Sequence, residues 1–434
     1  MRSALTQAVA GGEFRLASGV AGDLVNLLMQ TGRLREALDL VGQKTGYTRQ
    51  AGLGPWTQLL DQGRRLQILS LMGEHRQVLT ETSALQEQMN QLPTTRGSNE
   101  AANLWNVRET ILGTGHASAA ALGEWQQALD FNAAGLASKQ ARGAGAHEIA
   151  RFRFNDYGPL LELGRLDEAE HLLAGCQQVF EDHNDISQLA KVLSARADLE
   201  SRRGNLAAAL AFQQTAIRYS YARPEPRDIA THHHNLANYL GETGSDPPGQ
   251  RAHRLAAALI SQLTGMTHNL ADTVRVLAGE LRQDTGGHLP GTLGEVIESA
   301  EQTEGVRLGQ LITALQPDTQ AAEAALAQIL ATAASTDPDR DAIQDLLQQW
   351  EPVIALTAAA AAGDPQAAAQ LTPLLDQLAQ DEDWAALAGV LRRIAGGEHG
   401  QDLLGGLDPV DTAIAAEVLT RLAQDPAASG EEGP

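Results

Sequence analysis

The chain has 434 residues, of which 43% are hydrophobic and only 4% are aromatic. This apolar share excludes a wholly disordered chain, and the shortage of aromatic residues favours packed helices over a β-sandwich. The formal net charge of −22 disfavours nucleic acid as a partner, because proteins that bind phosphates normally present a basic surface.

The amino-terminal segment, Met1 to Phe14, lacks an apolar run of signal-peptide length, and no run of about 18 apolar residues occurs elsewhere. We therefore expect a cytoplasmic protein that does not bind a membrane. The single cysteine, Cys176, lies in an apolar helical stretch and is expected to be a buried core residue. One cysteine cannot form an intramolecular disulfide or a cysteine-rich zinc site.

A short phrase that begins with glycine recurs along the first half of the chain. The second residue after the glycine is usually apolar and the fifth is small, as in Gly164-Arg-Leu-Asp-Glu-Ala. The phrases start at intervals of 41, 50, 41 and 40 residues, at Gly32, Gly73, Gly123, Gly164 and Gly204. A period of this size predicts a solenoid of repeated units.

Each unit is expected to be a helical hairpin. The glycine ends the first helix in a left-handed conformation, and the second helix begins directly after it. A small residue then stands where two helices can approach closely, at Ala37, Val78, Ala128, Ala169 and Ala209. A sixth unit looks irregular, because Asp246-Pro-Pro-Gly249 interrupts the turn between a first helix at Thr231–Gly244 and a second at Ala252–Leu263. Residues 1–283 are therefore predicted to form about six hairpins and a capping helix.

These residues resemble the tetratricopeptide repeat, in a variant with loops longer than the family's 34-residue period allows. Asn235-Leu-Ala-Asn-Tyr-Leu is similar to the family's first helix, and the Gly164 phrase is similar to its second. The resemblance covers roughly Val20 to Leu263. It implies an all-α fold, namely a right-handed α-solenoid of helical hairpins followed by a carboxy-terminal helical region. It also implies that the chain binds a protein or peptide.

The array and its Ala-rich tail also resemble the carboxy-terminal part of bacterial STAND-type signalling ATPases. The nucleotide-binding motif of such ATPases, Gly-x-x-x-x-Gly-Lys-Ser/Thr, is absent from the sequence. This second resemblance implies an adaptor or sensor in a bacterial regulatory or defence system whose effector is a separate chain.

A turn-rich linker at residues 284–291 marks the start of a second helical region, predicted at 284–425. Asp364-Pro365 and Asp408-Pro409 are typical of helix starts, in which an acidic N-cap precedes proline. Leucines at helical spacing predict one core stripe, made of Leu371, Leu374, Leu375 and Leu378. Residues 426–434 are expected to be a disordered tail.

The sequence offers no arrangement typical of catalysis or metal binding. The adjacent histidines His232, His233 and His234 would point about 100° apart on a helix, so they cannot all ligate one ion. The pair His147-Glu148 lacks the second histidine of a zinc-protease helix, because Arg151 stands at that position. We therefore predict no enzymatic activity, no catalytic or metal-ligating residue and no cofactor.

Polar residues of the first helices are the default ligand contacts in a solenoid of hairpins. Aligned on the glycines, eight of them fall on successive inner ridges: Arg151, Asn155, Lys191, Asp198, Arg202, His234, Asn235 and Asn238. Because this set is net basic, an acidic peptide or a free carboxy terminus is the expected partner. Two alternatives stay open. The residues are ordinary polar surface or pair with acids of the neighbouring repeat, or the groove holds the chain's own tail or a second copy in a self-associating homo-oligomeric scaffold.

Overall fold

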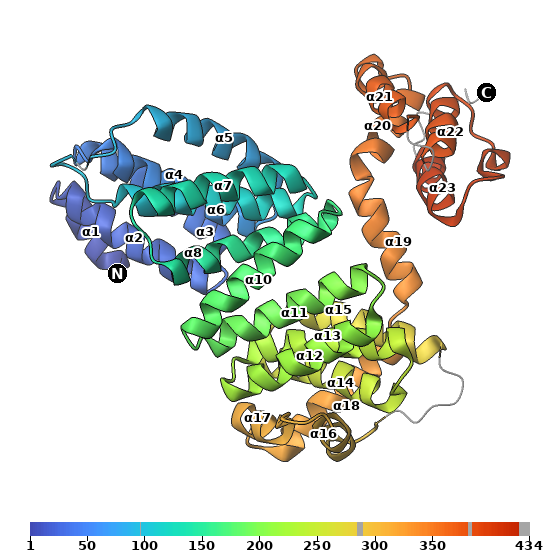
Figure 1. Cartoon of the computed structure of the whole chain (residues 1–434). Helices are drawn as coiled ribbons and strands as arrows, with labels where there is room; N and C mark the ends of the chain where they lie inside the picture. Colours follow the sequence, from blue (N-terminus) through green and yellow to red (C-terminus); the bar gives the residue numbers. More distant parts are fainter. Residues whose placement is uncertain (96, 284–289, 381–383, 425–434) are drawn as a thin grey trace. The chain divides into compact units, whose positions relative to one another are not determined.

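The computed structural model describes residues 1–95, 97–283, 290–380 and 384–424. The chain divides into two compact units, one made of Met1–Gly265 and Leu289–Ala322, the other of Met266–His288 and Glu323–Pro434. Within the described ranges both units are helical and contain no strand (Figure 1). The predicted all-α class is confirmed. The predicted tail at 426–434 and most of the predicted linker lie outside the described residues.

Helices of the first unit pack in consecutive pairs. The first helices are α2 (Phe14–Gln30), α4 (Pro55–Leu71), α6 (Leu104–Ala121), the short α8 and α9 (Ala146–Arg153 and Tyr157–Glu162), α11 (Ile186–Arg202) and α13 (Pro226–Thr243). The second helices are α3 (Leu34–Gln50), α5 (His75–Gln91), α7 (Trp125–Ala141), α10 (Leu166–Asp182), α12 (Leu206–Ala222) and α14 (Pro247–Thr264). A further helix, α1 (Arg2–Ala10), packs on α2. Pairing around the repeated glycines therefore follows the predicted pattern.

Glycine ends the first helices because the backbone there enters the left-handed region. At Gly164 φ is 67°, and the N–H of Arg165 donates to the carbonyl of Leu160 at 2.9 Å. This hydrogen bond pairs a carbonyl that the end of α9 would otherwise leave without a partner. Positive φ recurs at the other repeat glycines, Gly32, Gly73, Gly123 and Gly204.

Small residues at the fifth position of each phrase let the paired helices approach closely. All five are fully buried, with 0% of their surface exposed: Ala37, Val78, Ala128, Ala169 and Ala209. Cys176 is buried too, and its Sγ donates to the carbonyl oxygen of Ala150 at 3.4 Å. Burial raises the pKa of this thiol to about 11. It is therefore an unreactive core residue, as the sequence indicates.

The irregular sixth unit is a complete hairpin. Its first helix starts at Pro226, well before the expected Thr231. Asp246 does not interrupt the turn, because its side chain accepts a hydrogen bond from the N–H of Gly249 at 3.0 Å and caps α14. The helix that follows is buried on all sides between Ala252 and Ser261. Its other faces are covered by α16 (Leu293–Glu301) and α17 (Leu308–Leu315), which return to pack on it.

The second unit consists of α15 (Thr267–Gln283), most of α18 (Thr319–Ser335), α19 (Pro338–Gln349), α20 (Glu351–Ala361), α21 (Pro365–Leu378), α22 (Ala385–Ala395) and α23 (Pro409–Gln424). A boundary at residue 284 is predicted, whereas packing assigns α15 to the second unit and α16 and α17 to the first. The predicted leucine stripe of α21 is wrong at Leu374, which is 39% exposed. Leu371 and Leu375 form the buried stripe with half-buried Leu378, and Leu374 falls beside it because the helix buries only one narrow face.

Candidate ligand-binding pocket

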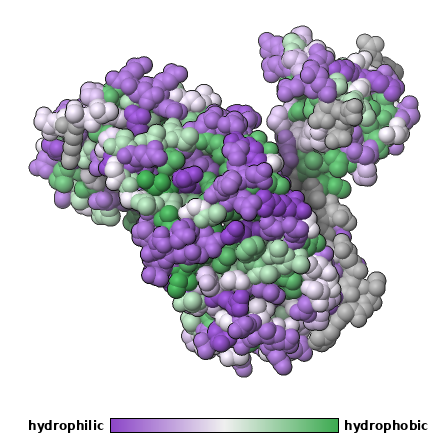
Figure 2. Space-filling model, viewed as in Figure 1, coloured by the Kyte–Doolittle hydropathy of each residue, from purple (hydrophilic) through white to green (hydrophobic). Residues whose placement is uncertain are grey.

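Surface hydropathy does not single out a site. Over the face of the first unit seen in Figure 2, hydrophilic side chains are interspersed with apolar ones. This mixture is expected, because more than about half of the surface of a folded protein is apolar. A site must therefore be located from the side chains that converge on a hollow.

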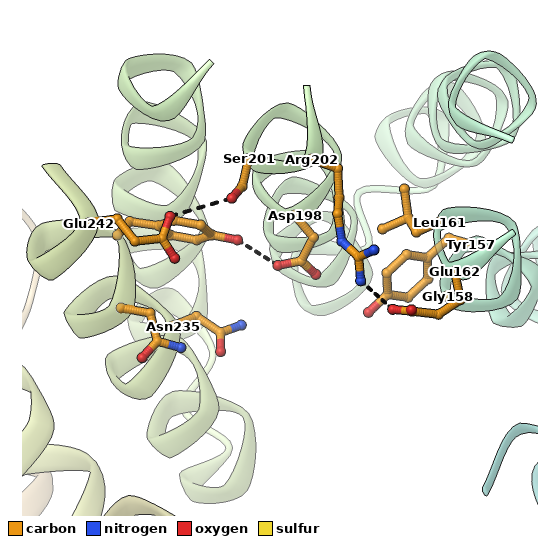
Figure 3. Close-up of a pocket in the computed structure, with 11 residues that line it drawn as sticks. Tyr157, Gly158, Leu161, Glu162, Asp198, Ser201, Arg202, Asn235 and Glu242 are labelled. Carbon is orange, nitrogen blue, oxygen red and sulfur yellow. Dashed lines mark hydrogen bonds and ion pairs between the residues drawn. The ribbon is translucent and has the colours of Figure 1, made fainter. Parts of the chain in front are cut away.

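One hollow lies between three consecutive first helices, α9, α11 and α13, and has a volume of about 280 Å³. We call it the repeat pocket (Figure 3). Polar side chains dominate its lining, which consists of Tyr157, Gly158, Leu161, Glu162, Asp198, Ser201, Arg202, Asn235, Asn238, Tyr239 and Glu242. Four of the predicted binding residues, Asp198, Arg202, Asn235 and Asn238, thus meet at one place.

The repeat register explains why these residues meet. Each of the three helices ends at a repeat glycine, namely Gly164, Gly204 or Gly244. Two residues before the glycine stands an exposed charged side chain: Glu162, Arg202 or Glu242. Six residues before it stands a half-buried position, occupied by Gly158, Asp198 or Asn238. Residues four apart share one face of a helix, so equivalent positions of successive repeats converge.

Asp198 is the half-buried acid of the pocket. Its Oδ1 accepts a hydrogen bond from the hydroxyl of Tyr239 at 2.6 Å. Burial raises the pKa of Asp198, although this hydrogen bond and the nearby charge of Arg202 act in the opposite direction. Burial and the charge of Asp198 raise the pKa of Tyr157 to about 12 and also raise the pKa of Tyr239. Both phenols therefore stay protonated at neutral pH and can donate hydrogen bonds.

The two predicted cations of this surface that lie on α11 are already paired. Arg202 forms an ion pair with Glu162 on α9, and Lys191 contacts Asp228 on α13 at 3.0 Å. Each therefore pairs with an acid of a neighbouring repeat, which is one of the alternatives that the sequence leaves open. Among the described residues, Asp198 and Glu242 form no ion pair. The charge that remains uncompensated in the pocket is negative.

Two amides complete the lining. The Nδ2 of Asn235 donates to Ser194 Oγ at 3.2 Å, and the Oδ1 of Asn238 accepts from Arg254 Nη2 at 2.7 Å. Each amide thus uses one of its two ends within the protein. Within the part of the chain that the structure describes, the carbonyl of Asn235 and the amino group of Asn238 form no hydrogen bond, so they can offer an acceptor and a donor to a ligand.

The other four predicted residues do not line the pocket. Arg151 and Asn155 are exposed, and the carbonyl of His234 accepts from Arg254 Nη1 at 3.1 Å. The first helix of the repeat that contains Arg151 and Asn155 is broken by a 3-10 turn, η1 (Phe154–Asp156). A 3-10 helix has about 3.0 residues per turn, whereas an α-helix has about 3.6, so η1 changes the direction in which the side chains before and after it point.

Seven pocket residues were not predicted: Tyr157, Gly158, Leu161, Glu162, Ser201, Tyr239 and Glu242. The repeat register alone could have identified Glu162 and Glu242, because both are two residues before a repeat glycine, as is Arg202. Tyr157 and Gly158 follow the 3-10 turn, for which the sequence has no clear signal.

The neighbouring histidines lie inside the fold. His233 Nε2 lies 2.7 Å from the hydroxyl of Tyr221, and its Nδ1 lies 2.7 Å from Nδ1 of His253. The Nε2 of His253 contacts Thr303 Oγ1 at 3.1 Å. Burial lowers the pKa of His233 well below its usual value, and lowers the pKa of both His232 and His253 to about 4. At neutral pH all three rings are uncharged; His233 and His253 belong to this buried hydrogen-bonded chain, whereas His232 contacts Gln213.

Within the described residues, no group of three or more histidine, cysteine, aspartate or glutamate side chains is placed to hold a metal ion. In the same part of the chain, no helix combines the length and the apolar character that crossing a membrane requires. The cytoplasmic location and the lack of enzymatic activity stay predictions.

No family model matches the chain, and no curated protein matches it. The resemblance to tetratricopeptide repeats therefore stays a prediction. A function has to be inferred from the chain's own residues and their contacts.

Proposed function

We propose that this chain binds a peptide segment of a protein partner in the repeat pocket and acts as an adaptor or sensor without a catalytic step of its own. The observation that carries the proposal is the convergence of equivalent positions from three successive repeats on one open pocket. Stacked repeats commonly recognise partners along such a surface. The setting that we propose is a bacterial regulatory or defence system with a separate effector.

The groups in the pocket suit a peptide. Asn235 and Asn238 offer a carbonyl and an amino group, which are the complements of a peptide N–H and C=O. A volume of about 280 Å³ falls below the roughly 300 to 1,000 Å³ of sites for small molecules and cofactors. It is large enough for one side chain and its adjoining backbone, so the remainder of the peptide would lie along the surface.

Gly158 offers a direct test, because it lines the pocket and a Cβ added there would meet nothing within 4 Å. A larger side chain can therefore start at this position without a clash at its Cβ, and a tryptophan there should occupy part of the hollow. Gly175 is a matched control, since it is exposed on α10, lies outside the pocket and has equally open space. The assay measures saturable binding of the full chain to an immobilised library of random heptapeptides.

We expect the unmodified chain and Gly175→Trp to bind the same peptides with equal affinity. Gly158→Trp should weaken binding at least about tenfold, because the anchoring side chain loses its pocket. Unchanged binding by Gly158→Trp, or no saturable binding by the unmodified chain, would overturn the proposal. Circular dichroism of each variant checks that the helices are intact.

A further inference from the structure

We infer that the repeat pocket selects peptides that carry a lysine or arginine side chain, which it holds between Asp198 and Glu242. This inference rests on the proposed function and specifies the chemistry of the bound segment. It differs from the acidic partner that the sequence favours.

The charges around the pocket support a cationic ligand. Four charged residues line it, and three of them are acids: Glu162, Asp198 and Glu242, with Arg202 as the only base. The ion pair between Arg202 and Glu162 cancels one charge of each sign. Two carboxylates then remain, neither in an ion pair with a described residue. A cation that enters the pocket would compensate them.

Hydrogen bonds hold these two carboxylates on neighbouring helices. Asp198 on α11 is bound by the hydroxyl of Tyr239 on α13, at 2.6 Å. A second hydrogen bond has its donor on α11 and its acceptor on α13: Ser201 Oγ donates to Glu242 Oε2 at 3.4 Å (Figure 3). Neither contact adds a positive charge. An ammonium or guanidinium group between the helices could donate charge-assisted hydrogen bonds to both acids.

The rest of the lining suits the stem of a long cationic side chain. Tyr157 and Leu161 give the pocket an aromatic and an aliphatic wall, which in Figure 3 lies across Arg202 from Asp198. Lysine and arginine bury their methylene groups against apolar surface, and aromatic rings attract cations. Asp198 is half-buried and has therefore lost part of its hydration, which raises its pKa; a bound cation would replace the lost solvation.

An acidic group would fit less well. The only base in the lining, Arg202, is already engaged by Glu162. A ligand carboxylate would have to share Arg202 with Glu162 and approach Asp198 and Glu242, which carry the same charge. The pocket should therefore discriminate against acidic side chains.

The test uses heptapeptide libraries with a fixed central residue, which is lysine, arginine, glutamine or glutamate, and random flanking residues. We expect lysine-centred or arginine-centred peptides to bind about tenfold more tightly than glutamine-centred ones, as hydrogen bonds to charged groups commonly do. Glutamate-centred peptides should bind most weakly. The preference should diminish as salt concentration rises.

Two substitutions locate the preference. Glu242→Arg reverses one exposed charge of the pocket and should shift the preference at least tenfold towards glutamate. Glu87→Arg is its control, because Glu87 is exposed on α5, outside the pocket, and gives the same change in net charge. Asp198→Asn keeps an acceptor for Tyr239 and should reduce the preference for cations severalfold.

The outcomes separate this inference from the proposed function. If Gly158→Trp abolishes binding but the unmodified chain prefers glutamate or shows no preference, the peptide site stands and its cationic selectivity is refuted. If Glu87→Arg shifts the preference as much as Glu242→Arg, the effect is one of overall charge and the inference fails. If no library binds at all, both proposals fail.

Discussion

Mild acid should destabilise the first unit through its buried histidines. His232 and His253 have a pKa of about 4 in the folded protein, because burial disfavours the charged ring. In the unfolded chain histidine titrates near pH 6.5. Below that pH the unfolded chain takes up protons that the folded one cannot. The stability of the folded protein that depends on these neutral rings is therefore fully present above about pH 6.5 and is lost as the pH falls towards 4.

The magnitude follows from these two values. At pH 5 the ring is almost fully protonated in the unfolded chain and mostly neutral in the folded one, which favours unfolding by about 2 kcal/mol per histidine. His232 and His253 together account for about 4 kcal/mol, a large part of the roughly 5 to 15 kcal/mol of a typical domain. His233 acts in the same direction. Near His232, the charge of Asp228 opposes the shift and that of Lys191 adds to it.

Urea denaturation followed by far-UV circular dichroism, at pH 7 and pH 5, measures the effect. His232→Asn keeps an acceptor near the amide nitrogen of Gln213, which lies 3.3 Å from His232 Nδ1. We expect this variant to lose about 2 kcal/mol less than the unmodified protein on acidification. His171→Asn, at an exposed position of α10, should behave as the unmodified protein does. An identical pH dependence in the unmodified protein and in His232→Asn would refute the reasoning.

Three further predictions concern the helical hairpins, and urea denaturation checks each. Gly164→Ala should lower the free energy of unfolding by about 1 to 2 kcal/mol, because φ is positive there. Its control, Gly19→Ala, lies within α2 in open space and should raise the free energy of unfolding by up to about 1 kcal/mol. Equal effects of the two substitutions would contradict the role of the turn. Ala169→Leu should lower the free energy of unfolding by about 1 to 3 kcal/mol, because the larger side chain overpacks a buried site. A similar decrease in the control Ala174→Leu, at an exposed position of α10, would exclude overpacking as the cause. Asp246→Ala should cost about 1 kcal/mol through loss of the α14 cap, and an unchanged stability would show that the cap contributes nothing.

The helical pairs could be predicted because their signals are local. A glycine that must adopt positive φ and an alanine that must let two helices approach are both visible as residue types at fixed positions, such as Gly164 and Ala169. The sixth unit was harder to predict. Asp246-Pro-Pro looks like an interruption in the sequence, and only the capping hydrogen bond shows that it begins α14.

The pocket was predictable where the helices are regular. Asp198 and Asn238 occupy the same position before their glycines, so alignment of the repeats places them together. Arg151 and Asn155 do not line the pocket, and η1, in which Asn155 lies, alters the helical phase there; that change depends on packing rather than on residue type. The pairing of Lys191 with Asp228 depends on how neighbouring helices meet, and no spacing within one repeat reveals it.

The path of the chain has a consequence for any attempt to separate the two units. The polypeptide leaves the first unit after Gly265, returns to it at Leu289 and leaves again after Ala322. The first unit is therefore discontinuous in sequence, and a fragment ending at Gly265 would lack α16 and α17, leaving the apolar residues of α14 in contact with water. The chain thus passes between the units three times, and cutting one or two of these passages would still leave the units joined. Limited proteolysis should consequently release the first unit only after all three have been cut.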